Sequence, residues 1–389
     1  GACSYLFERK MKYKINKRQI IVFIIIIIFT IFLYQFNQID KVQLYHQNGK
    51  SFESGEVVDI IQDNITDNGN QIGKQIVTIK LLSGPYKGKI VEANSSSSYL
   101  YGTHCQIGMR VIVDISESQN SLYVNVYSFD RSHIIYAIVV FFLMSLCIVG
   151  GKQGFNSAIA LIFTFICIIF LFLPMIYKGV SPILSAMIIS ILITIVTMYL
   201  IGGWSSKTMT AIIGTISGVI ISGIFAFIFS WLTHISGYNV SDIEQLVYLE
   251  QMTSIHIGEL MYAGILISTL GAIMDVAMSI SSTLNEIYYH NPYLSVKELF
   301  HSGQNVGKDM MGTMSNTLIL AFTGSSINTL IFIYAYDYPL LQIMNMYSIG
   351  IEIIQGIAAT LGVILTVPLV SLISAYHLKH KAINPIDTF

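Results

Sequence analysis

A single aspartate, Asp275, lies inside one of the longest apolar stretches of the sequence. An ionised carboxylate within a membrane span is costly, so such residues usually face a cavity or a partner. On a helix, Asp275 would share one face with Gly264, Ser268, Ala272 and Ser279, and small residues let neighbouring helices approach closely. We therefore predict that Asp275 lies on a packed face and handles an ion or a proton. A hydrogen-bonded packing residue, or a carboxylate at headgroup level, is the alternative.

A second polar group opens the next apolar stretch. Asn316 would lie near the depth of Asp275, and a hydrogen bond between the two side chains would satisfy both. Thr313 and Thr317 add hydroxyl oxygens, which are hard ligands suited to Na⁺ or to a proton relay. With Ser279, these residues form our predicted intramembrane polar site. Polar contacts between helices, without any ligand, are the alternative.

Two further carboxylates are expected at the outer side of the membrane. Glu259 opens one apolar segment, whereas Glu352 lies one turn into the last segment and shares a helical face with Gln355. Together they could form an outer mouth that admits a cation. Acidic residues near helix N-termini are also stabilised by the helix dipole and need no ligand.

Motifs of other chemistry are missing from the sequence. It contains no HExxH, GxSxG, P-loop or CxxC pattern, and we see no second carboxylate at the depth of Asp275 for an aspartyl protease. Of the four cysteines, Cys147 and Cys167 lie in apolar runs, and Cys105 stands alone in the candidate external domain, so no disulfide framework is available there. We therefore predict that the chain is not an enzyme and needs no cofactor.

Methionines gather around the same two apolar stretches: Met274, Met278, Met310, Met311 and Met314. Thioethers could carry a soft metal such as copper. Because no cysteine or histidine joins them, flexible filling of the helix interfaces is the favoured interpretation.

The composition identifies the surroundings of the chain. Of its 389 residues, 53% are hydrophobic and only 11% are charged, against about 25% in soluble domains. The net charge of −1 gives no reason to expect nucleic acid. Eight apolar segments are long enough to span a bilayer: 20–36, 134–149, 155–176, 180–200, 209–232, 257–280, 313–335 and 348–375. Gly214 and Gly218 form a GxxxG pattern, which favours close helix packing.

The N-terminal region predicts a membrane anchor. Residues 1–19 read as a basic cytoplasmic segment, in which Met11 resembles the natural start and Gly1 to Lys10 an extension. The apolar segment 20–36 lacks small residues after it for a signal peptidase, so we expect an uncleaved anchor.

Residues 37–131 predict an extracytoplasmic all-β domain. Charges, glycines and serines appear here, and the apolar residues alternate. Five strands are expected: 55–61, 75–82, 88–93, 110–115 and 122–127. Five short strands suit a small barrel of the OB type, although half of a sandwich is the alternative.

Lysine positions predict the orientation of the seven-helix domain, residues 132–378, and of the tail, residues 379–389. With the N-terminus in the cytoplasm, the inner loops and tail hold most of the lysines: Lys152, Lys207, Lys297, Lys308, Lys379 and Lys381. The outer short loops hold only Lys178. By the positive-inside rule, both termini are cytoplasmic and the β-domain is outside.

The connection between residues 281 and 311 is the longest in the bundle. Asn291-Pro292 interrupts the chain, and Ser295 to Glu298 forms a capping box for a short helix ending near Gly303. Such a helix could lie on the membrane surface as a gate or docking element, or serve as an inert elbow.

Three stretches carry a resemblance to a known family: Gly271–Ser279, Gly307–Leu320 and Gly324–Ser326. By their order and placement, the chain resembles YibE/F-like membrane proteins from about Gly55 to Tyr376. The resemblance implies a multi-pass protein of the bacterial cytoplasmic membrane, but it implies no reaction.

Two hypotheses follow. The first is a permease for a small solute or ion, with the polar site around Asp275 and an outer mouth at Glu352. The second is a non-transporting sensor or scaffold whose external β-domain binds a protein partner. We favour the permease because polar residues recur on predicted packing faces.

Overall fold

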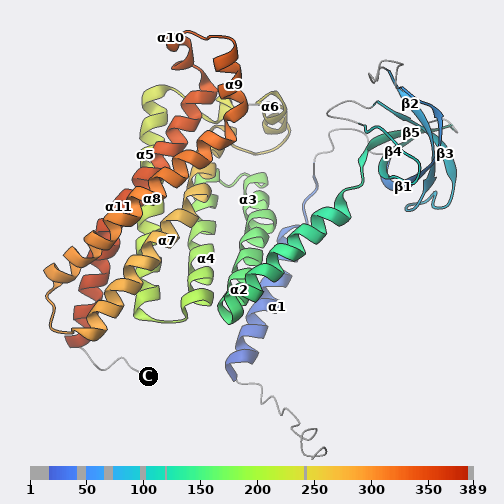
Figure 1. Cartoon of the computed structure of the whole chain (residues 1–389). Helices are drawn as coiled ribbons and strands as arrows, with labels where there is room; N and C mark the ends of the chain where they lie inside the picture. Colours follow the sequence, from blue (N-terminus) through green and yellow to red (C-terminus); the bar gives the residue numbers. More distant parts are fainter. Residues whose placement is uncertain are drawn as a thin grey trace, which may run out of the picture. The chain divides into compact units, whose positions relative to one another are not determined.

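A computed structural model describes residues 17–41, 50–64, 73–96, 102–118, 121–240 and 243–383. They fall into two compact units, one from Lys41 to Val149 and one that joins the residues up to Asp40 with those from Gly150 onward (Figure 1). Met11 and the first part of the basic segment lie outside the described residues, as does the end of the tail.

The first unit contains a closed β-barrel in the strand order β1-β2-β3-β5-β4. The strands are β1 (Lys50–Gln62), β2 (Gln75–Leu81), β3 (Ile90–Ser95), β4 (Arg110–Ser118) and β5 (Ser121–Phe129). All pairs are antiparallel except β3 and β5, which run parallel. All five predicted strands are present, because the alternation of apolar residues matches the inward and outward sides of the barrel wall.

A buried glutamine, Gln75, forms hydrogen bonds within the barrel core. Besides inward-facing residues such as Val77, Ile79 and Val113, the core holds Cys105, and burial raises the pKa of its thiol. Gln75 is fully buried and makes two hydrogen bonds to the Cys105 backbone: its Nε2 donates to the carbonyl at 3.0 Å, and its Oε1 accepts from the N–H at 2.8 Å. Gln75 therefore holds the Cys105 segment against the barrel.

Replacing that glutamine should open the barrel. Gln75→Leu leaves the buried backbone N–H and carbonyl of Cys105 without hydrogen-bond partners. Each unpaired group costs roughly 1–3 kcal/mol of folding free energy. A loss of about 2 kcal/mol would raise the rate of Cys105 labelling by a thiol reagent roughly 30-fold. The measurement uses the full chain with the other cysteines replaced. Lys80→Met, on the exposed side of the same strand, should leave the rate unchanged; equal rates for the two variants would refute the role of Gln75.

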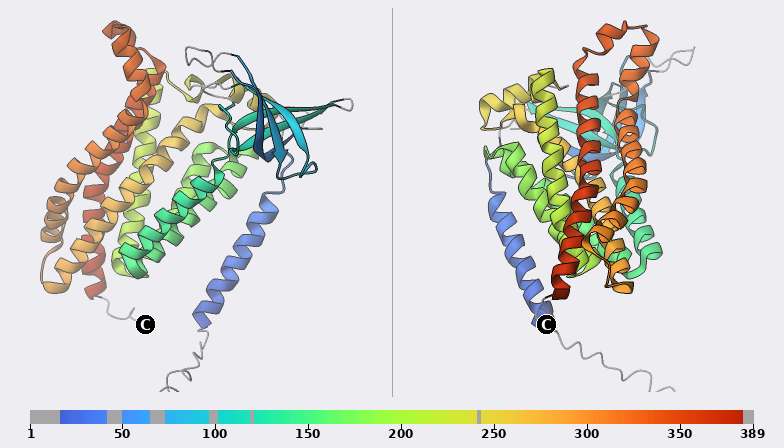
Figure 2. Two further views of the ribbon diagram at one scale, coloured as in Figure 1. Left: turned by 45° about the vertical axis from the view of Figure 1, so that its right-hand side comes forward. Right: turned by 90° about the vertical axis from the view of Figure 1, so that its left-hand side faces the viewer.

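The second unit is helical. Its elements, with the helix that leads into it from the barrel, are α1 (Lys17–Phe36), α2 (Ser132–Cys167), η1 (Ile168–Phe172), α3 (Leu173–Tyr177), α4 (Pro182–Gly202), α5 (Ser206–Thr233), η2 (Gly237–Asn239), α6 (Ile243–Met252), η3 (Ile257–Glu259), α7 (Leu260–His290), α8 (Val296–Ser325), α9 (Ile327–Ala335), α10 (Leu340–Ile343) and α11 (Tyr347–Ile383). The start of α1 and the end of α11 lie at the same end of this unit (Figure 2).

The predicted anchor packs on the helical unit. The ring of Phe29 lies 5.9 Å from that of Phe163, and Nδ2 of Asn37 donates to the carbonyl of Phe170 at 2.7 Å. Nζ of Lys178 donates to the carbonyl of Phe36, also at 2.7 Å, and lies over its ring. These contacts join α1 to the run that ends with α3.

The predicted count of eight spans is not confirmed. Among the described residues, five helices are long and apolar enough to cross a membrane, or six if α8 and α9 form one bent span. The predicted spans 134–149 and 155–176 belong to one run, 132–177, which is interrupted at Gly151. Gly151 has φ 54° and ψ −130°, a conformation that side-chain-bearing residues rarely adopt, so the helix breaks there.

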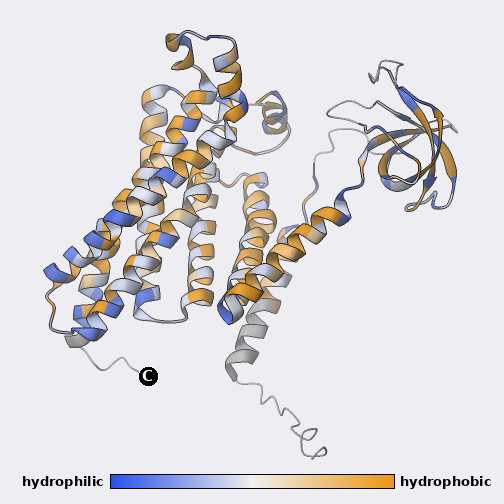
Figure 3. Ribbon diagram, in the orientation of Figure 1, coloured by the Kyte–Doolittle hydropathy of each residue, from blue (hydrophilic) through white to orange (hydrophobic). Residues whose placement is uncertain are grey.

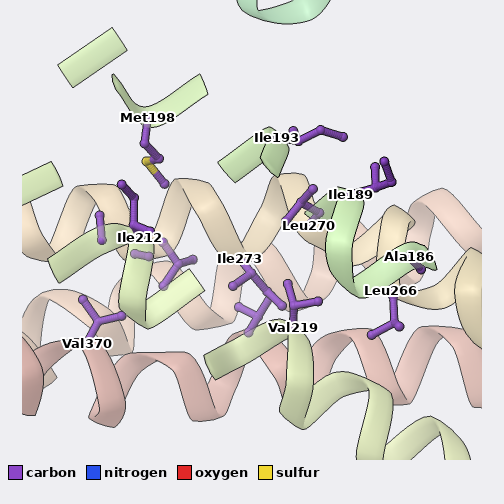
Figure 4. Packing of buried hydrophobic residues seen from close by; sticks show 14 of the residues in the cluster. Ala186, Ile189, Ile193, Met198, Ile212, Val219, Leu266, Leu270, Ile273 and Val370 are labelled. Atoms are coloured by element: carbon purple, nitrogen blue, oxygen red, sulfur yellow. The ribbon is translucent and has the colours of Figure 1, made fainter. Parts of the chain in front are cut away.

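The core of the helical unit joins α4, α5, α7 and α11 (Figure 4). Ile193, Val219 and Ile273 are almost fully buried there. The GxxxG prediction is confirmed: a Cβ built on Gly218 would overlap Oγ1 of Thr366, and one on Gly214 would overlap the side chain of Val370. The two glycines therefore let α5 approach α11 closely.

The region predicted as a long connection is mostly helix. The capping box is confirmed: Ser295 accepts from the N–H of Glu298, whose carboxylate accepts from the Ser295 N–H, and this backbone hydrogen bond lowers the pKa of Glu298. The predicted end near Gly303 is wrong, because α8 continues to Ser325. Gly303 and Gly307 instead let α8 pack against α11. Figure 3 shows the first half of α8 as largely hydrophilic, unlike the more apolar α4.

Candidate functional site

The predicted span 313–335 is broken in the structure, where α8 and α9 meet at an angle of 64°. Two side-chain hydroxyls hydrogen-bond to backbone carbonyls just before the bend: Thr323 donates to the carbonyl of Ile319 at 2.8 Å, and Ser325 to that of Phe322 at 2.7 Å. Such bonds bend helices. Ser326 forms the joint, with φ −96° and ψ 9°. The bend separates two half-helices within one apolar stretch.

A cavity of about 250 Å³ lies beside this bend, between α8, α9 and the start of α11. Its walls are mostly apolar, with three polar side chains among them. The lining residues are Ile319, Phe322, Thr323, Ser326, Leu330, Ile349, Glu352, Ile353, Gly356 and Ile357. The volume is close to the lower end of small-molecule pockets, roughly 300–1,000 Å³.

Glu352 supplies the one charged group among these lining residues. It lies near the start of α11, and its Oε2 atom is buried without a hydrogen-bond partner among the described residues. Leaving a buried carboxylate oxygen unpaired is unfavourable unless something else binds it. The predicted outer-mouth residue is thus the residue of the cavity most suited to bind a ligand.

The other predicted outer residues lie elsewhere. Glu259 precedes α7, and its carboxylate accepts a hydrogen bond from the hydroxyl of Ser181, which caps α4. This contact ties the ends of two helices together. Gln355 follows Glu352 by three residues but does not line the cavity. The structure therefore does not bring Glu259 and Glu352 together in one cavity.

The prediction that Asp275 lies on a packed face is wrong for the single chain. Asp275, Gly264 and Ser268 are exposed on the side of α7 opposite Ile273, which is fully buried. A Cβ built on Gly264 would meet no atom within 4 Å. The physical reason is that α7 packs mainly through its larger apolar residues, whereas Gly264, Ser268 and Asp275 stay uncovered and Ala272 is only partly buried. Half-buried Ser279 lies at the edge of this face.

The expected pairing of Asp275 with Asn316 is likewise not formed. Asn316, Thr313 and Thr317 are exposed on α8. The two threonines donate back to their own helix, Thr313 to the carbonyl of Met310 at 3.0 Å and Thr317 to that of Thr313 at 2.9 Å. None of these residues lines the cavity at Glu352. Apart from half-buried Ser279, the predicted intramembrane site is therefore a set of uncovered polar side chains on α7 and α8.

The methionines fill the spaces between helices, as expected. All five are partly buried and pack against the large hydrophobic core: Met274, Met278, Met310, Met311 and Met314. Among the residues that the structure describes, no group of three or more His, Cys, Asp or Glu side chains is placed to hold a metal ion.

Sequence reasoning missed Ser326 and Thr323 as parts of a site. The stretch Gly324-Ser325-Ser326 combines turn-forming residues inside an apolar run, a signal that could have indicated a helix break. Their approach to Glu352 could not be inferred, since it depends on how α11 packs against α8.

At least five apolar helices, long enough to cross a bilayer and packed around one core, define a multi-pass helical membrane protein. The profile of the YibE/F-like protein family matches residues 138–380, and that of the YibE/F family N-terminal domain matches residues 52–129. The chain belongs to the YibE/F-like family, and the predicted resemblance is confirmed. No curated protein and no solved structure matches it significantly.

Proposed function

We propose that this protein is a permease, rather than an enzyme, and that its substrate site is the cavity at Glu352. The observation that carries the proposal is a buried carboxylate oxygen without a partner, beside a broken helix in an apolar bundle. Discontinuous helices form the substrate and ion sites of many transporters, because irregular backbone at membrane depth is tolerated only where it is buried in protein or lines a cavity.

The proposal places the site in the outer half of a bacterial cytoplasmic membrane. The lysine distribution favours a cytoplasmic location for both chain ends. The start of α1 and the end of α11 lie at the same end of the helical unit, in agreement with that topology (Figure 2). Glu352 lies near the other end of α11, which starts at Tyr347. The cavity would then open first to the outside.

A cysteine introduced at Ser326, between α8 and α9, tests the proposed permease function. Ser326→Cys, in a chain whose native cysteines are replaced, is treated with a sulfonated maleimide that does not cross membranes. A permease exposes its site to either side in turn, so we expect labelling in right-side-out vesicles and in inside-out vesicles. A cavity that opens to one side only would give labelling in one preparation.

The control for this experiment is Ile224→Cys, because Ile224 is 52% exposed on the apolar outer surface of α5. It should stay unlabelled in both preparations, since a charged reagent does not enter hydrocarbon. One-sided labelling of Ser326→Cys, or none, would refute alternating access.

The sensor or scaffold remains the second candidate because the barrel presents aromatic side chains. Phe52 is 61% exposed, Tyr123 59% and Tyr127 45%. The rings of Phe52 and Tyr127 lie 5.1 Å apart. Exposed aromatic residues are typical of protein interfaces. The strand order supports the predicted OB-like fold, a common binding scaffold. If Phe52→Ser with Tyr127→Ser abolishes the recovery of one co-purifying protein, the barrel binds a partner; unchanged recovery would exclude this surface.

A further inference from the structure

We propose that the cavity at Glu352 binds a small organic cation whose charged group meets the carboxylate and whose apolar body fills the remaining space. The inference deepens the proposed permease by naming its substrate class, and it rests on that function only for the step of transport. Binding itself depends on the cavity alone.

The charge of the ligand follows from the lining. Of the described residues around the cavity, Glu352 is the only ionisable one, and no Lys, Arg or His is among them. An anion would face a carboxylate without any compensating positive charge. A cation instead supplies the partner that Oε2 of Glu352 lacks. The site therefore selects positive over negative ligands.

The walls argue against a divalent inorganic cation. Mg²⁺ and Ca²⁺ take six or more oxygen ligands in proteins. The cavity offers only one carboxylate and the hydroxyl oxygens of Thr323 and Ser326. Most of the remaining surface is Ile, Leu and Phe. A bare ion would lose its hydration shell there without gaining enough oxygen ligands in exchange. The alkyl groups of a substituted ammonium can instead pack against the apolar walls.

The shape and the aromatic residue fit the same ligand class. Phe322 lines the cavity together with Glu352, and an aromatic face attracts a cation, most strongly when water is excluded. The volume of about 250 Å³ accommodates a ring with a quaternary ammonium group. The cavity therefore pairs one negative charge with a compact apolar space.

Calorimetry tests the inference by measuring the affinity of small ligands for the full-length protein in nanodiscs of zwitterionic lipid. The probe is benzyltrimethylammonium, compared with its neutral isostere neopentylbenzene and with the anion phenylacetate. We expect wild-type protein to bind the cation and to reject phenylacetate. Glu352→Gln should weaken cation binding roughly tenfold or more, because the charge pair with the carboxylate is lost at its buried Oε2 atom. Neopentylbenzene should bind the two proteins equally.

The control and the second variant keep the test independent of folding. Glu244→Gln removes an exposed carboxylate from α6, outside the cavity, and should leave the affinity unchanged. Ile357→Lys places a competing ammonium at the cavity from a 45% exposed position, so it should weaken cation binding even if Glu352→Gln does not fold.

The outcomes separate the ligand class from transport. No binding of benzyltrimethylammonium, or equal binding by wild type and both cavity variants, overturns the ligand class even if Ser326→Cys is labelled from both sides. Binding that requires Glu352 establishes the cation site even if that labelling is one-sided, in which case transport alone is refuted.

Discussion

Gly218→Leu should unfold the helical unit or lower its stability by more than about 3 kcal/mol, beyond the usual range for overpacked cores. At this position even a Cβ would overlap Oγ1 of Thr366 and lie 2.9 Å from Cγ2 of Ile273. A leucine must therefore separate α5 from α11 and disturb α7 as well. The measurement is thermal unfolding of the detergent-solubilised protein by intrinsic fluorescence, with gel filtration to detect aggregation.

Gly264→Leu is the matched control for this prediction. Both glycines lie in long apolar helices, and both substitutions raise intrinsic helix propensity by similar amounts. A Cβ on Gly264 meets nothing within 4 Å, so the leucine finds open space on the exposed face of α7. The thermal unfolding midpoint of Gly264→Leu should stay near that of the wild type. Equal destabilisation by the two variants would show that close packing of α5 is not the cause.

Gly356→Phe should close the cavity while leaving the protein folded. Gly356 lines the cavity, and a Cβ there would lie at an ordinary contact distance, 3.7 Å, from Cδ2 of Phe322. The aromatic ring can therefore enter the space beside Glu352. We expect maleimide labelling of Ser326→Cys to slow roughly tenfold or more, because a filled cavity leaves no path for the reagent. The thermal midpoint should hold or rise, since apolar surface becomes buried.

The control for cavity closure is Gly271→Phe. Gly271 is exposed on α7, and a Cβ there would meet no atom within 4 Å. It lies outside the cavity lining, so labelling of Ser326→Cys should proceed at the original rate. If Gly356→Phe leaves labelling as fast as Gly271→Phe does, the reagent reaches Ser326 by a route other than the cavity, and the proposed site is wrong.

The uncovered polar face of α7 and α8 has a consequence for experiments on Asp275. Asp275 and Asn316 are exposed on the single chain and line no part of the cavity at Glu352. A change at Asp275 is therefore expected to act without contact to a ligand in that cavity. Experiments on the proposed substrate site should begin at Glu352, although the sequence drew attention first to Asp275.

The sequence alone determined the five strands of the β-domain and two local features of the helical unit. The alternating apolar residues of the β-domain predicted all five strands, because a barrel wall separates inside from outside with a period of two residues. The capping box at Ser295 and the close packing at Gly218 were also predictable, since both depend on a few residues at fixed helical spacing.

Only the tertiary structure decided where those elements break and which faces they bury. Hydropathy cannot distinguish one straight span from two half-helices, so the bend at Ser326 escaped prediction. The break at Gly151, by contrast, falls between the two predicted spans 134–149 and 155–176. Helical spacing placed Asp275 with small residues, but whether a neighbouring helix covers that face depends on the competition among all apolar faces of the bundle. The same competition brought Glu352 of α11 beside the end of α8, residues from two helices that no local pattern connects.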